Sequence, residues 1–180
     1  VFLDNVGKEA DYWRKPMEPE MDGNVKVFNL VCQDIQWETS PGMAFPAMAY
    51  NGMVPGPEIR VTEGDEVRFV VKNEMKESTA IHFHGVFVPN DQDGVPFVTQ
   101  PAIKPGESFT YEFTALEPGV GMYHSHHDAQ VQIPNGLAGA IIIGDWKAMA
   151  MKAAGGRTGD SNGKAEQEVV MVLNDAGNIG

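Results

Sequence analysis

The sequence is poor in cysteine, in basic residues and in long apolar runs. The single cysteine, Cys32, excludes an internal disulfide, so cysteine pairing gives no support for secretion. Only 13 Lys and Arg stand against 25 Asp and Glu, which argues against a nucleic-acid partner because phosphate binding needs clustered basic side chains. No stretch approaches the roughly 20 apolar residues that span a bilayer, so no membrane partner is expected.

Helical periodicity is also nearly absent, whereas short alternating segments recur between Gly and Pro turns. The segments with strand character are 25–32, 58–62, 67–71, 81–88, 109–113, 121–126 and 137–143. Strands this short, at this spacing, predict an all-β sandwich or barrel. A chain of 180 residues, 42% of them hydrophobic, can bury one core, so we expect a single complete domain over residues 25–146.

The segments on either side of this domain have a different composition. Residues 1–24 are polar and carry two prolines, which is typical of an N-terminal arm. Residues 147–167 include a Gly-rich run typical of a linker. Residues 168–180 begin with an apolar run that predicts the first strand of a following domain. Because that strand would have no partner here, we expect the chain to be part of a longer polypeptide.

All 5 histidines fall in two motifs, His82-Phe83-His84 and His124-Ser125-His126-His127. Alternate residues of a strand share a face, so each His-x-His pair projects its rings the same way, about 6.6 Å apart along the strand. A single histidine is most often not a ligand, but two pairs on neighbouring strands would converge four imidazoles. That donor set suits copper or zinc. His127 faces the other way and is not expected to be a ligand.

The residues around the two pairs complete a family resemblance. The positions that carry it are Tyr50-Asn51-Gly52, Pro55-Gly56-Pro57, Ile59, Val61, Gly64-Asp65, His82-Phe83-His84-Gly85, Asp93-Gly94-Val95-Pro96, Thr99-Gln100, Ile103, Pro105-Gly106, Phe109, Tyr111, Phe113 and Tyr123-His124-Ser125-His126. They resemble the first domain of laccase-type multicopper oxidases, over about residues 25–145. The resemblance implies a cupredoxin-like Greek-key β-sandwich. It also implies an enzyme that oxidises a small reducing substrate and reduces dioxygen to water, in the periplasm or outside the cell.

The resemblance further implies a role for each histidine. His82 would bind the type 2 copper, and His84, His124 and His126 would bind the two type 3 coppers. Such a cluster takes eight histidines from two domains. The missing four would come from a second cupredoxin domain, in the same or a neighbouring chain, whose first strand would be residues 168–180.

No type 1 copper is expected in this domain. A blue copper needs a thiolate beside its imidazoles. Ser125 occupies the position of the family's cysteine, Gln130 stands where the type 1 histidine would be, and Cys32 lies far away in an apolar strand. Alternation also turns Ser125 away from its neighbouring histidines, so strand geometry alone predicts that Ser125→Ala leaves the copper content unchanged.

Asp93 has two interpretations. Asp-Gly is a common turn dipeptide, which needs no functional role. The resemblance instead places this carboxylate near the type 2 copper, where it would assist proton delivery to reduced oxygen. Met43, Met48 and Met53 are too widely spaced for a dense thioether site and are expected to fill gaps in the core or to form a contact surface.

Three other functions remain open from the sequence. A copper nitrite reductase is related in fold, but a single catalytic copper needs fewer ligands than two His-x-His pairs provide, and that enzyme carries its blue copper in the first domain. A non-catalytic copper-binding cupredoxin domain is the second alternative. Structural zinc bound without thiolates is the third, and such sites are unusual.

Overall fold

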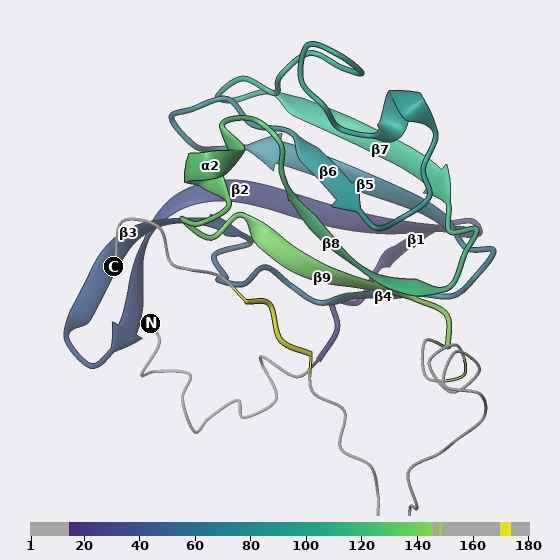
Figure 1. Ribbon diagram of the computed structural model, residues 1–180, viewed down its shortest axis with the longest axis horizontal. Coiled ribbons are helices and arrows are strands. Elements are labelled where there is room, and N and C mark those ends of the chain that lie inside the picture. Colours follow the sequence, from purple (N-terminus) through teal and green to yellow (C-terminus); the bar gives the residue numbers. More distant parts are fainter. Residues whose placement is uncertain (1–14, 146–147, 149–169, 174–180) are drawn as a thin grey trace, which may run out of the picture.

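The computed structural model describes residues 15–145, 148 and 170–173 (Figure 1). Most of the predicted arm, linker and following strand lies outside these residues, so those three domain boundaries stay predictions. Within the arm, Glu20–Asp22 forms a short strand, β1, so the sheet begins before residue 25. Residues 170–173 are described and lie in no strand. In the part of the chain that is described, no helix combines the length and the apolar character needed to cross a membrane.

The described chain folds into two β-sheets with very little helix. The larger sheet has the order β1-β2-β5-β7, with β3 paired to β2, and the smaller sheet has the order β4-β9-β8-β6. The strands after β1 are β2 (Val25–Ser40), β3 (Met43–Tyr50), β4 (Ile59–Val61), β5 (Glu66–Asn73), β6 (Ile81–His84), β7 (Ser108–Thr114), β8 (Gly119–Ser125) and β9 (Ala138–Ile143). A 3-10 turn, η1 (Asn90–Gln92), and a one-turn helix, α2 (Ala129–Gln132), lie in the connections. The predicted all-β sandwich is confirmed.

Alternation of apolar residues creates the core between the sheets. In β5, Val67, Phe69 and Val71 are buried while their neighbours are partly or fully exposed. The Phe69 ring stacks on Phe113 of the same sheet at 5.7 Å and meets Phe83 of the smaller sheet at 4.8 Å between centroids. Aromatic contacts of this kind join the two sheets and remove large apolar areas from water. The core therefore fixes how β6 lies on the larger sheet.

Strand pairing is mostly antiparallel, with two parallel exceptions. β2 pairs with β5 and β4 pairs with β9 in parallel register. Parallel neighbours require crossover connections between the sheets, as in Greek-key sandwiches. β6 and β8 pair in antiparallel register at one edge of the smaller sheet, and both histidine motifs lie there.

One hairpin extends beyond the body of the sandwich (Figure 1). β2 continues to Ser40, well past residue 32, and returns through Gly42 into β3. Strand β3 was not predicted from the sequence. Pro46 and the small residues of this segment weaken its strand pattern, and its pairing depends on the extension of β2.

Candidate metal centre

The two histidine motifs lie on neighbouring antiparallel strands. In the register of β6 and β8, His82 is directly opposite His124 and Phe83 is opposite Tyr123. Side chains of successive residues leave a strand on opposite faces, so both aromatic residues enter the core and the histidines leave it. Phe83 and Tyr123 are 1% and 0% exposed, as predicted. Core packing of one face thus presents the imidazoles on the other.

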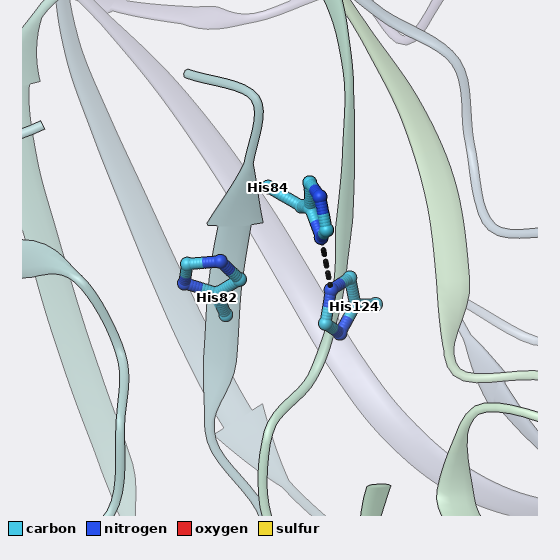
Figure 2. Close-up of side chains that lie close together, drawn as sticks. All are labelled: His82, His84 and His124. Carbon is cyan, nitrogen blue, oxygen red and sulfur yellow. Dashed lines mark hydrogen bonds between the residues drawn. The ribbon is translucent and has the colours of Figure 1, made fainter. Parts of the chain in front are cut away.

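The imidazoles of the two motifs gather into one cluster. The His82 ring centroid lies 5.2 to 5.7 Å from those of His84, His124 and His126. The ligand atoms of His82, His84 and His124 all lie within 4.8 Å of one another (Figure 2). The rings of both His-x-His pairs therefore lie close together, although His126 is not among the three histidines whose ligand atoms form this group.

Backbone carbonyls fix the orientation of two of the rings. His82 Nδ1 lies 2.7 Å from the carbonyl oxygen of Asp93, and His124 Nδ1 lies 2.8 Å from that of Ser125. A carbonyl can only accept, so in both rings Nδ1 carries the proton and Nε2 is left unprotonated. Hydrogen bonding of this kind at the far nitrogen is what orients metal-binding histidines.

His84 and His124 have the spacing of two ligands to one ion. His84 Nδ1 and His124 Nε2 lie 3.4 Å apart, the contact drawn in Figure 2. An ion at about 2.0 Å from each nitrogen, the usual metal–imidazole distance, would see them at an angle of about 115°. That angle suits a low-coordinate copper or zinc ion. Because His124 carries its proton on Nδ1, its Nε2 accepts the proton of His84 Nδ1.

Burial keeps His124 ready to bind a metal. His124 is 6% exposed, and desolvation lowers its pKa, with the nearby His82, His84 and His126 adding to the effect. The hydrogen bond to the Ser125 carbonyl acts in the opposite direction and is the weaker influence. A lowered pKa favours the neutral imidazole, which is the form that coordinates metals.

Asp93 reaches the cluster through its backbone as well as its carboxylate. Its Oδ1 lies 3.3 Å from His82 Nδ1, farther than its carbonyl oxygen. The next residue, Gly94, has φ +75°, and a Cβ there would lie 1.6 Å from the Ile81 carbonyl oxygen. Only glycine permits this approach of the loop to β6. This carbonyl contact could not be predicted from residue types, because every residue has a carbonyl.

The remaining candidates lie at the edge of the cluster or away from it. The His127 ring contacts Phe97, with centroids 6.0 Å apart, and is not among the grouped ligand atoms. Gln130 is exposed on α2. Cys32 is fully buried in the core, where desolvation raises the pKa of its thiol to about 12. Its reactivity is suppressed, in keeping with the prediction of a small buried apolar residue.

A β-sandwich with paired histidines on adjoining strands is the arrangement of a cupredoxin-like metal domain. A family model described as multicopper oxidase matches residues 31–148. The chain belongs to the multicopper oxidase family, whose members are oxidoreductases.

Individual curated proteins are similar to this chain in sequence. Oxidoreductase ptaE of Pestalotiopsis fici is 39% identical over 147 residues, which cover 79% of this chain and 23% of the relative. The copper resistance protein A homolog of Pseudomonas syringae pv. tomato is 37% identical over 132 residues, covering 73% of this chain and 22% of the relative. The chain thus spans less than a quarter of the length of these curated relatives.

Solved structures of multicopper oxidases share the fold. The enzyme from Pseudomonas thermotolerans superposes with a TM-score of 0.65 at 36% identity, covering 67% of this chain and 29% of that one. The Campylobacter jejuni metallo-oxidase gives a TM-score of 0.64 at 38% identity, covering 71% of this chain and 27% of that one. These similarities support the cupredoxin-like fold that the sequence predicted.

Proposed function

We propose that this chain supplies half of a type 2/type 3 trinuclear copper cluster, in an enzyme that oxidises a small reducing substrate and reduces dioxygen to water. The observation that carries the proposal is the convergence of imidazoles from β6 and β8, with three ligand nitrogens within 4.8 Å. Imidazole donors suit copper, the metal of the family. Copper would supply the electron-transfer chemistry, and the chain's own residues would hold and orient it.

Each histidine has a specific place in this proposal. His82, oriented by the Asp93 carbonyl, would hold the type 2 copper through Nε2. His84 Nδ1 and His124 Nε2 would hold one type 3 copper, because their 3.4 Å separation fits a shared ion. His126, whose ring lies 6.3 Å from that of His124, would hold the other. The carboxylate of Asp93 would deliver protons from solvent to reduced oxygen, because it is partly exposed and its Oδ1 lies 3.3 Å from His82 Nδ1.

The cluster as this chain forms it is open on one side. His84 and His126 are exposed to solvent, whereas His124 is buried. Three or four imidazoles are too few for three copper ions. The remaining ligands would come from a second cupredoxin domain, in the same or a neighbouring chain, which would also carry the type 1 copper. We place the enzyme in the periplasm or outside the cell, and fractionation of the source cells tests that location.

Two alternatives remain within copper chemistry. A nitrite reductase-like enzyme would need one catalytic copper here, and a passive copper-binding domain would need no coupled pair. The spacing of His84 and His124 beside a separately oriented His82 favours more than one ion. Electron paramagnetic resonance separates these cases, because a trinuclear cluster shows one type 2 signal and a silent, antiferromagnetically coupled pair.

Oxygen uptake by the intact protein with a reducing substrate tests the proposal. We expect His84→Ala to abolish uptake while the sandwich stays folded, because His84 is exposed and contributes nothing to the core. The matched control is His127→Ala, a histidine of the second motif whose side chain contacts Phe97 instead. Residues 1–180 alone should bind copper weakly and consume no oxygen. Full activity in the His84→Ala protein would refute the proposed role.

A further inference from the structure

A buried polar network lies behind the histidine-bearing strand β8. Thr79, Ser125 and Gln132 are each 0% exposed. The Ser125 and Thr79 hydroxyl oxygens lie 2.7 and 2.9 Å from Gln132 Oε1. Gln132 Nε2 donates to the Ser78 carbonyl at 2.8 Å, which fixes the orientation of the amide. Both hydroxyls therefore donate to one oxygen of a side chain that is itself anchored.

The Ser125 hydroxyl also closes a tight turn around His126. Its oxygen accepts a hydrogen bond from the His127 N–H at 3.2 Å, the pattern of a serine turn. His126 is the middle residue of that turn and lies one position beyond the end of β8. The other three histidines of the cluster lie within β6 and β8, where pairing between the strands holds their backbone.

His126 thus depends on local contacts that its partners do not need. Its own N–H donates to the Ala80 carbonyl at 3.2 Å, which continues the strand pairing by one bond. Beyond that hydrogen bond, the direction of the backbone is set by the turn that the Ser125 hydroxyl closes. Since the hydroxyl that closes the turn is held by Gln132, the position of the His126 ring is tied to a side chain on α2.

We propose that Ser125, braced by Gln132, is the positioning residue that fixes His126 for copper binding. This inference rests on the proposed function, because it concerns one ligand of the same cluster. The Ser125 side chain is buried and contacts Gln132 behind β8. Removing its hydroxyl takes the acceptor away from the His127 N–H, which opens the turn, and leaves Gln132 Oε1 with Thr79 as its remaining hydroxyl donor. Strand alternation predicted no effect of Ser125→Ala on copper, whereas these hydrogen bonds predict the loss of one type 3 ligand.

The test is Ser125→Ala in the intact, copper-loaded protein. We expect the silent copper pair to uncouple, so that one copper is lost or the fraction detected by electron paramagnetic resonance rises. In the metal-free protein, the His127 amide should exchange its hydrogen about fivefold faster, as expected for the loss of a typical hydrogen bond. Gln132→Leu, which retains the Ser125 hydroxyl but removes its brace, should give both effects more weakly.

Tyr123→Phe is the matched control. It lies on the same strand and face and also loses a buried hydroxyl bond, to the Pro57 carbonyl at 2.6 Å. It should lower stability without uncoupling copper or speeding His127 exchange. Wild-type coupling and exchange in both Ser125→Ala and Gln132→Leu would overturn the positioning role. If the His84→Ala protein loses copper in that case, the proposed function stands without the positioning role. If the His84→Ala protein retains all its copper, both the proposed function and the positioning role of Ser125 are wrong.

Discussion

Gly94→Ala is the substitution whose effect the structure defines most closely. An added Cβ would lie 1.6 Å from the Ile81 carbonyl oxygen, so the loop must retreat by about 1.4 Å to reach even the 3.0 Å limit of real contacts. The φ of +75° adds about 1 kcal/mol for an L-residue in the left-handed region. A retreat of that size would stretch the bond from His82 to the Asp93 carbonyl from 2.7 Å beyond hydrogen-bonding range.

Two separate effects are expected from this displacement. The free energy of unfolding should fall by about 2 to 3.5 kcal/mol, from the backbone penalty, the lost hydrogen bond and residual crowding. In the proposed cluster, the affinity of the His82 site for copper should fall about 10- to 100-fold, the usual cost of losing the acceptor that orients a ligand histidine. Urea denaturation measures the first, and the type 2 resonance signal after dialysis against a chelator measures the second.

Gly106→Ala provides the control for backbone strain. Gly106 has φ +82°, and a Cβ there meets nothing within 4 Å. The control should lose about 1 kcal/mol and no copper. If the two alanine variants are destabilised equally, or if Gly94→Ala retains its full type 2 signal, the argument that this close approach supports His82 is wrong.

Three further predictions concern buried groups. Desolvation raises the pKa of the buried Cys32 thiol to about 12, against 9.0 when exposed, so the thiol should resist alkylation in the folded protein near neutral pH. The unfolded chain loses this proton first. The free energy of unfolding, measured by denaturation, should therefore fall as pH rises from 9.0 towards 12. Burial lowers the pKa of His124 in the folded protein, so the unfolded chain takes up this proton first as pH falls. The free energy of unfolding of the metal-free protein should therefore decrease below pH 6.5. Replacing His124 with Asn should flatten this dependence. Phe69→Ala should cost about 3 to 5 kcal/mol in urea denaturation, because its ring packs on both sheets; a loss below about 1 kcal/mol would contradict the packing argument.

Period-two alternation was sufficient to predict the orientation of the histidines. Placing Phe83 and Tyr123 inward required only that each motif be a strand, and both are buried in the structure. The pairing of β6 with β8 was an assumption from the repeated motif, and the register that sets His82 opposite His124 supports it. The alternation did not show where strands end: the apolar run from 81 to 88 is a strand only to His84.

Contacts made through the backbone, or between residues distant in sequence, were not predictable in this way. The Asp93 carbonyl on His82 depends on the path of a loop, which the side chains do not encode individually. The burial of Gln132 was not predicted, because a polar residue in a short segment is usually exposed. Tertiary packing buries it fully in the structure. The hairpin strand β3 was missed because its pairing with an extended β2, and not its own composition, makes it a strand.

The parallel pairing of β4 with β9 has a consequence for when the histidine cluster forms. Ile59 is aligned with Ile141, about 80 positions later, so the smaller sheet closes only after nearly the whole domain has been synthesised. Long-range pairings of this kind slow folding, because chain entropy is lost before the contacts form. β6 joins that sheet at its edge, through β8. We therefore expect the histidine cluster to form late in folding, when β6 and β8 come together in the nearly complete sandwich.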